Sequence, residues 1–90
     1  MIDLSIVIIN KNYKKFLKFC IKSCLNQETK FNYEILFSDD GSTDGSIDYI
    51  KSLKNKKIKI FLSKNQGIEK ISNKALKKAK GKFIVRVDSD

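Results

Sequence analysis

The chain has 90 residues and a formal net charge of +9, from 19 basic and 10 acidic residues. A chain of this length buries only slightly more than about 60% of its unfolded surface, so it forms one small domain or part of a larger one. No stretch approaches the about 20 apolar residues that cross a membrane, and the start lacks the basic-then-apolar order of a secretion signal. The sequence therefore predicts a soluble cytoplasmic domain.

The first expected element is a buried strand followed by a helix. Residues Leu4 to Ile9 form a continuous apolar run with β-branched side chains, which is typical of a strand covered on both faces in a parallel sheet. Residues 10–13 break this pattern, and residues 16–25 resume it with helical spacing. Cys20 and Cys24 lie four apart in that helix, and the chain has no histidine. We expect them to be buried thiols, because a metal site needs more ligands.

The second expected strand, Tyr33 to Phe37, leads directly into Ser38-Asp39-Asp40-Gly41-Ser42-Thr43-Asp44-Gly45-Ser46. Two adjacent carboxylates therefore stand at the carboxyl end of a strand, where open α/β sheets bind ligands. Gly41 can adopt the positive φ of an abrupt turn, and Ser42 or Thr43 can cap the next helix. The pair of acids suits a ligand with N–H or O–H donors, or a cation. The alternative is a polar turn in which the acids only cap the helix.

The rest of the chain alternates helix and strand. The expected elements are a short helix over residues 47–53, a strand from Ile58 to Leu62, a loop at Asn65-Gln66-Gly67, a helix with Ile68, Ile71, Ala75 and Ala79 on one side, and a strand from Phe83 to Val87. Ile68 and Ile71 are expected in the core, and Gly81 is placed to end the helix. Long crossovers between strands predict a three-layer α/β/α fold with a parallel sheet in the order 3-2-1-4. That order gathers the carboxyl ends of strands one, two and four, the last of which runs into Asp88-Ser89-Asp90.

Asp39 to Gly45, with the sequence DDGSTDG, is similar to the signature of family 2 glycosyltransferases, the GT-A fold enzymes that use nucleotide-sugar donors. Other features follow in the family's order: a strand entering an Asn-containing loop (Ser5 to Asn12), a helix ending in Leu25-Asn26-Gln27, the Asn-x-Gly at 65–67, and Asp88-Ser89-Asp90, which resembles the DxD metal motif. The resemblance implies that residues 1–90 are the N-terminal, donor-binding part of a Rossmann-like GT-A domain, truncated at the DxD motif.

The resemblance also implies a role for each residue of the predicted donor site. Ile9, Asn10 and Lys11 lie where the family contacts the nucleotide base. Asp40 would accept a hydrogen bond from the base, whereas Asp39 would hold the loop. The Asp88-Ser89-Asp90 segment would meet the donor and its metal: Asp90 is the implied ligand of Mn²⁺ or Mg²⁺, and Asp88 would face the donor's ribose or the metal's waters.

The sequence departs from the family pattern at three places. Ile9 stands where proline is common and Lys11 where an aromatic residue is common, so Tyr13 becomes an alternative stacking residue. Ile71 and Ser72 replace the Ala-Arg pair whose arginine can approach the donor. That arginine contact does not carry over to this chain.

The implied function is transfer of a sugar from a nucleoside diphosphate sugar, a UDP-sugar above all, to a hydroxyl of an acceptor glycan or lipid-linked glycan. No residue here matches the family's general base, which we expect after Asp90, so the isolated fragment is expected to be inactive. Two alternatives stay open. A nucleotidyltransferase is disfavoured because the loop at residues 10–13 is not glycine-rich, and a non-catalytic anion-binding module would act through the basic helices.

Lysines are concentrated on the first and last expected helices, where solvated helix faces commonly carry them. The other interpretations of this charge are peripheral contact with an anionic membrane or with donor phosphates, and nucleic-acid binding. We expect no nucleic acid, because no basic stripe is interleaved with the aromatic residues that single-strand binding needs.

Overall fold

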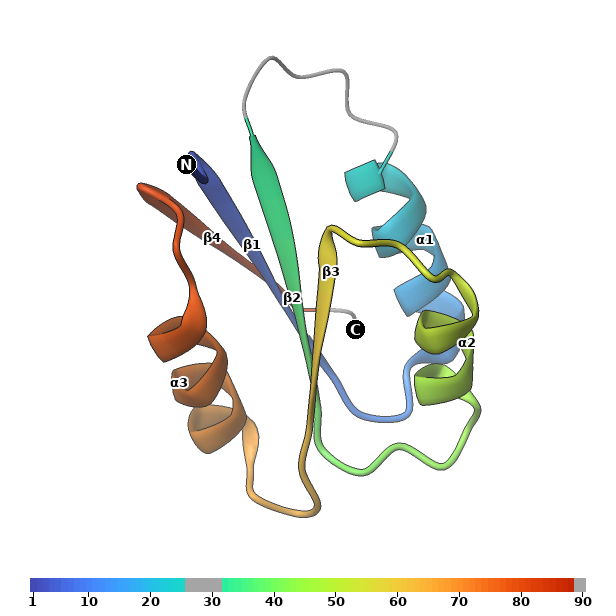
Figure 1. The fold of residues 1–90 in the computed structure, drawn as a ribbon. Coiled ribbons are helices and arrows are strands. Elements are labelled where there is room, and N and C mark those ends of the chain that lie inside the picture. Colours follow the sequence, from blue (N-terminus) through green and yellow to red (C-terminus); the bar gives the residue numbers. More distant parts are fainter. Residues whose placement is uncertain (26–31, 89–90) are drawn as a thin grey trace.

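The computed structural model describes residues 1–25 and 32–88, with the backbone alone at Asp88. Its elements are β1 (Leu4–Asn10), α1 (Lys14–Leu25), β2 (Tyr33–Asp39), α2 (Ser46–Ser52), β3 (Ile58–Leu62), α3 (Ile68–Lys78) and β4 (Phe83–Asp88). The strands form one parallel sheet in the order β3-β2-β1-β4, as predicted. Helices α1 and α2 cover one face and α3 the other, which gives three layers (Figure 1). Among the described residues, no helix is long and apolar enough to cross a membrane.

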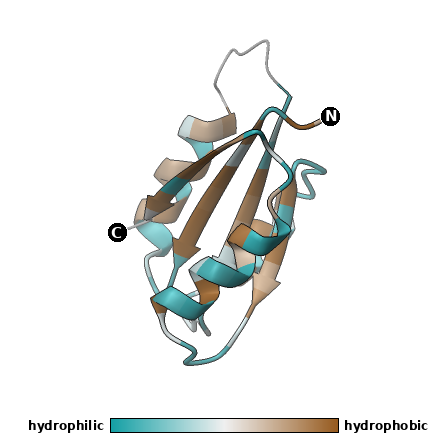
Figure 2. Ribbon diagram, turned by 90° about the vertical axis from the view of Figure 1, so that its left-hand side faces the viewer, coloured by the Kyte–Doolittle hydropathy of each residue, from teal (hydrophilic) through white to brown (hydrophobic). Residues whose placement is uncertain are grey.

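The core has two parts because the central strands β1 and β2 bury both of their faces. On one face, buried residues of both strands pack with α1 and α2: Ile6, Ile8, Ile35, Phe37, Leu17, Ile21, Cys24 and Ile50. On the other face the cluster is Val7, Ile9, Leu36, Ile71 and Ala75, the last two from α3. Figure 2 shows the strands as mostly hydrophobic and the outward side of α3 as mostly hydrophilic.

The two cysteines differ in their surroundings. Cys24 is buried in the core, as expected, whereas Cys20, one turn earlier in α1, is only half-buried. Burial raises the pKa of the Cys24 thiol, and the neighbouring Cys20 adds to the rise. Both are free thiols in the structure, and within residues 1–25 and 32–88 neither belongs to a group of three potential metal ligands.

The expected cap of α2 is wrong. The helix begins at Ser46 after Gly45, which has a φ of 90°, and no side chain caps it. Instead Asp44, one residue earlier, accepts a hydrogen bond from the Ser46 N–H (3.0 Å). Ser42 cannot serve as a cap because its hydroxyl lies within the preceding turn, where it donates to Asp39 (2.6 Å).

Gly81 does not end α3, as was expected, but allows a close contact with β1. Helix α3 ends at Lys78, and its C-cap Ala79 is extended, so no glycine stops the helix. The Gly81 N–H donates to Ser5 Oγ (2.8 Å), and a Cβ at this position would lie 2.5 Å from the Ser5 nitrogen. Position 81 is therefore a glycine because the α3–β4 connection runs directly against β1.

A buried carboxylate fastens the same connection to the sheet. Glu34 of β2 accepts hydrogen bonds from Ser5 Oγ (2.6 Å), from the Lys80 N–H (2.7 Å) and from Lys59 Nζ (2.8 Å). Burial alone would raise the pKa of Glu34, but these donors outweigh it and lower the pKa below its ordinary value. The ionised Glu34 thus links β1, β2 and β3 to the segment that connects α3 with β4. It lies at the end of the sheet that is away from the acidic turn.

Candidate functional site

The polar residues predicted to form the site follow strands that end side by side. In the parallel register Asn10 of β1 pairs with Asp39 of β2, and Ile9 pairs with Asp88 of β4 on its other side. The Asp40 N–H then donates to the Asn10 carbonyl (3.1 Å), which extends the β1–β2 contact by one residue. The acidic turn, the Asn10 loop and the start of the DxD-like segment therefore share one edge of the sheet.

Asp39 is buried, and its carboxylate is fully used within the turn. One oxygen accepts hydrogen bonds from Asn10 Nδ2 (2.9 Å) and Ser42 Oγ (2.6 Å). The other accepts from the N–H groups of Gly41 (3.0 Å) and Ser42 (2.8 Å). Since a carboxylate has about four acceptor positions, Asp39 has none left for a ligand. Its geometry is that of a residue that shapes the loop.

Replacement of Asp39 by asparagine should therefore reduce stability. The amide keeps the shape but turns an acceptor oxygen into a donor that faces other donors, so the free energy of unfolding should fall by about 1–2 kcal/mol. Urea unfolding of the two proteins measures this difference. The matched control is Asp48→Asn, an exposed acid in the first turn of α2, which should lower the midpoint by much less than Asp39→Asn. Equal midpoints for Asp39→Asn and the parent would contradict the structural role.

The β1–α1 loop is tied to the acidic turn by three further hydrogen bonds. The Asn12 N–H donates to Ser42 Oγ (2.9 Å), and Asn12 Oδ1 accepts from the Thr43 N–H (2.7 Å). The Lys14 N–H donates to Asp44 Oδ2 (2.9 Å). Asn12 has a φ of 57°, a left-handed conformation that asparagine tolerates better than most residues. The two loops consequently form one rigid wall.

Asp40 is held differently, by the loop between β3 and α3. Its two oxygens accept hydrogen bonds from the N–H groups of Gln66 (2.7 Å) and Gly67 (3.0 Å). Positive φ angles at Asn65 (51°) and Gly67 (92°) form the turn that carries these N–H groups. Burial would raise the pKa of Asp40, but the two N–H groups and the nearby charge of Lys11 outweigh it and lower the pKa below its ordinary value. Asp40 is therefore ionised at neutral pH, and each oxygen keeps a free acceptor position.

A pocket of about 280 Å³ opens beside Asp40. Its lining is Ile9, Asn10, Lys11, Tyr13, Asp40, Ile68 and Ile71. Lys11 Nζ donates to Asn65 Oδ1 (2.9 Å), so the Lys11 side chain joins the β1–α1 loop to the β3–α3 loop. Most of the remaining wall is aliphatic or aromatic. The pocket thus combines apolar walls with one carboxylate acceptor and one ammonium donor.

The exposure of Ile68 contradicts the prediction that it lies in the core. Its side chain is 59% exposed, so it is not part of the core, whereas Ile71 is 1% exposed and belongs to both the core and the pocket. The N–H groups of Gln66 and Gly67 also escaped the sequence analysis. The Asn-x-Gly loop was predicted, but residue types do not reveal which main-chain N–H groups of a loop donate hydrogen bonds.

The structure brings four of the predicted donor-site residues together around the pocket: Ile9, Asn10, Lys11 and Asp40. Asp39 lies behind them and supports the turn. Asp88 ends β4 beside Ile9, but only its backbone is described, and Ser89 and Asp90 lie outside the described residues. Within residues 1–25 and 32–88, no three acidic or cysteine side chains gather into a possible metal site.

Comparison with known proteins identifies the family. Residues 5–90 match the family described as Glycosyl transferase family 2. The chain belongs to this family. It is 41% identical over 90 residues to an uncharacterized glycosyltransferase of Haemophilus influenzae, covering 97% of this chain and 36% of that protein. It is 38% identical over 88 residues to a chondroitin synthase of Pasteurella multocida, covering 96% of this chain and 9% of that protein.

A solved structure shows the same fold. The crystal structure of S. aureus TarS 1–349 in complex with UDP-GlcNAc has a TM-score of 0.88 and 30% identity, and the match covers 99% of this chain and 27% of that one. The four-stranded sheet therefore has the GT-A, Rossmann-like fold predicted from the DDGSTDG resemblance. The chain spans about a third or less of the length of these similar proteins.

Proposed function

We propose that the intact protein transfers a sugar from a nucleoside diphosphate sugar, with a UDP-sugar as the favoured donor, to a hydroxyl of an acceptor glycan or lipid-linked glycan. The observation that carries this proposal is the pocket beside Asp40, at the edge where the β1 and β2 strands end. Membership of glycosyl transferase family 2 and the UDP-GlcNAc complex of TarS support the class of donor.

The pocket has the properties that a nucleotide base requires. Its aliphatic and aromatic walls, from Ile9, Tyr13 and Ile68, suit the faces of a flat ring. Asp40 is fixed, ionised and still able to accept, so it can take a ring N–H in a charge-assisted hydrogen bond. Lys11 uses one ammonium N–H on Asn65 and has two more that can meet a carbonyl oxygen of the base.

The divalent ion belongs at the end of β4 in this proposal. Asp39 and Asp40 are poor candidates for metal ligands, because the acceptor positions of Asp39 are all used and Asp40 lines the pocket assigned to the base. Asp88 and Asp90 supply carboxylates in a segment that starts beside Ile9, a pocket residue. Oxygen ligands of this kind fit Mg²⁺ or Mn²⁺, which when bound would stabilise the negative charge of the departing diphosphate.

Titration of the intact protein with UDP, followed by amide NMR, tests the donor site. With Mg²⁺ present, the largest shifts should occur at Asp40, Gln66 and Gly67, because the base engages Asp40 and these N–H groups hold it. Replacing Mg²⁺ by Mn²⁺ should broaden the signals of residues around Asp88, since the paramagnetic ion would lie near them. Shifts confined to the lysines of α1 and α3 would contradict the proposal.

A further inference from the structure

Helix α3 carries a stripe of lysines on its outward side. Lys70, Lys74 and Lys77 recur at the helical spacing that places them on one face, and all three are exposed. We call these three residues the lysine stripe. Lys78 is a further exposed lysine of α3, Lys80 and Lys82 follow it along the chain, and Glu69 is the one acidic residue among the exposed positions of α3. The opposite side of the helix, with Ile71 and Ala75, is buried against the sheet.

A hollow of about 350 Å³ lies beside the lysine stripe. Its lining is Leu62, Ser63, Gln66, Lys70, Ile71 and Lys74. Two ammonium groups can therefore converge on a ligand there, next to the exposed side chain of Leu62 at the end of edge strand β3. Ser63 Oγ is buried at the same place and has no hydrogen-bond partner within the described part of the chain. Two cations beside an exposed apolar side chain match a phosphate group joined to an acyl chain.

We propose that the lysine stripe and the adjoining hollow form a docking surface for a membrane of anionic phospholipids. Clusters of lysine on a helix surface are attracted to anionic headgroups, and the attraction adds up lysine by lysine. The headgroup phosphate would lie between Lys70 and Lys74, with Leu62 against the acyl boundary. The binding is peripheral, because the apolar side of α3 stays in the core.

This surface adjoins the nucleotide pocket through two shared residues. Ile71 lines both hollows, and Gln66 lines the basic one while its N–H holds Asp40 in the other. Docking of α3 would consequently bring the donor pocket close to the membrane plane. The inference goes beyond the donor chemistry and does not depend on it, because vesicle binding is measured without any nucleotide.

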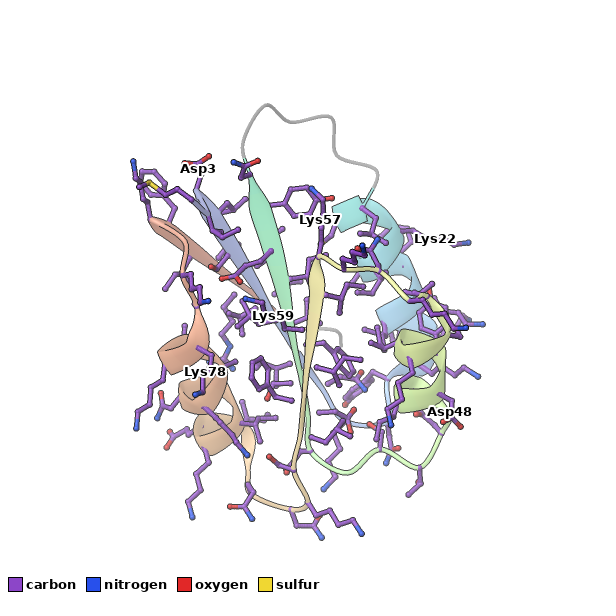
Figure 3. The ribbon with its side chains drawn as sticks, viewed as in Figure 1. Asp3, Lys22, Asp48, Lys57, Lys59 and Lys78 are labelled. Atoms are coloured by element: carbon purple, nitrogen blue, oxygen red, sulfur yellow. The ribbon has the colours of Figure 1, made fainter. Side chains whose placement is uncertain are left out.

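The test compares two triple variants of the intact protein with equal changes in net charge. In the first, Lys70, Lys74 and Lys77 are replaced by glutamine. In the control, glutamine replaces Lys15, Lys22 and Lys51, which are exposed on α1 and α2 across the sheet from α3. Figure 3 shows this separation for Lys78 on α3 and Lys22 on α1. Binding to vesicles of phosphatidylcholine with phosphatidylglycerol is measured by sedimentation, beside pure phosphatidylcholine vesicles.

The parent should bind the anionic vesicles and not the neutral ones, and its binding should weaken as salt rises. The stripe variant should lose at least about tenfold in partitioning while the control stays within about threefold of the parent. Equal losses in both variants would overturn the proposal, because net charge alone would then explain binding. So would full binding by the stripe variant, or stripe-dependent binding to single-stranded RNA without vesicle binding. Circular dichroism confirms that both variants are folded.

Discussion

The Asp40→Ala variant should bind UDP about ten to a hundred times more weakly than the parent. A hydrogen bond to an ionised acceptor contributes about 1.5–3 kcal/mol, which corresponds to one to two decades in the dissociation constant. The matched control is Asp44→Ala, which removes another carboxylate of the same turn. Asp44 holds the Lys14 and Ser46 N–H groups as Asp40 holds those of Gln66 and Gly67, but it does not line the pocket. Calorimetric titration of the intact proteins gives both constants.

A modified nucleotide separates direct contact from a loosened loop. If Asp40 accepts the N–H of the base, the parent should bind UDP more tightly than its N3-methyl analogue, which lacks that donor. The Asp40→Ala variant should bind both nucleotides with similar affinity. Unchanged UDP affinity in a folded Asp40→Ala variant would show that the base does not use this carboxylate.

The same carboxylate sets a pH dependence for the β3–α3 loop. Because the pKa of folded Asp40 lies below its ordinary value, the ionised form stabilises the fold, and this contribution is complete above the ordinary aspartate range. It is lost as the pH falls through the lowered pKa, when the carboxyl group becomes protonated. The contribution of Asp40 to UDP binding should accordingly stay constant from neutral pH into the ordinary carboxyl range and weaken only below it.

The fold was predictable because its information is carried by apolar patterns that repeat along the chain. The β-branched apolar run from Leu4 to Ile9 suited a strand covered on both faces, and the order of the strands followed from the length of the crossovers. Ile68 was misplaced by the same reasoning. Helical periodicity puts it on the side of Ile71, but it is the first residue of α3, and its side chain lines the open pocket beside Asp40 and not the core.

The site was predictable only as far as side chains reveal it. The DDGSTDG stretch indicated a ligand edge, and its resemblance to the family implied that Asp39 holds the loop and Asp40 meets the base. The residue types alone could not show that the Asp39 oxygens are all used while Asp40 keeps acceptor capacity. That difference depends on contacts from distant parts of the chain, because the Asn10 side chain occupies one Asp39 oxygen, and the Gln66 and Gly67 N–H groups, 26 and 27 residues away, take one position on each Asp40 oxygen. Gly81 shows the same limit, because a glycine is needed there for the close approach to Ser5 and not for a local turn.

The Asp90→Asn variant should lose turnover while it keeps the fold and the base pocket. Asparagine has nearly the shape of aspartate but carries no charge, so affinity for Mn²⁺ should fall and the leaving diphosphate should be less well stabilised. The expected loss is at least about a hundredfold, or about 2.7 kcal/mol of barrier. Binding of the uridine part should change little, because the pocket residues lie on β1, on α3 and in the loops that follow β1 and β2.

Metal dependence distinguishes this role from a structural one. Turnover of the intact protein with its donor is measured over a range of Mn²⁺ concentrations for the parent, for Asp90→Asn, and for the exposed control Asp48→Asn. If Asp90 is a metal ligand, its variant should need far more Mn²⁺ for half-maximal turnover, whereas the control should follow the parent. A structural defect would lower turnover equally at every Mn²⁺ concentration and would also shift the unfolding midpoint. Near-parental turnover of Asp90→Asn at limiting Mn²⁺ would exclude Asp90 as the essential ligand and leave Asp88 as the carboxylate to examine at that strand end.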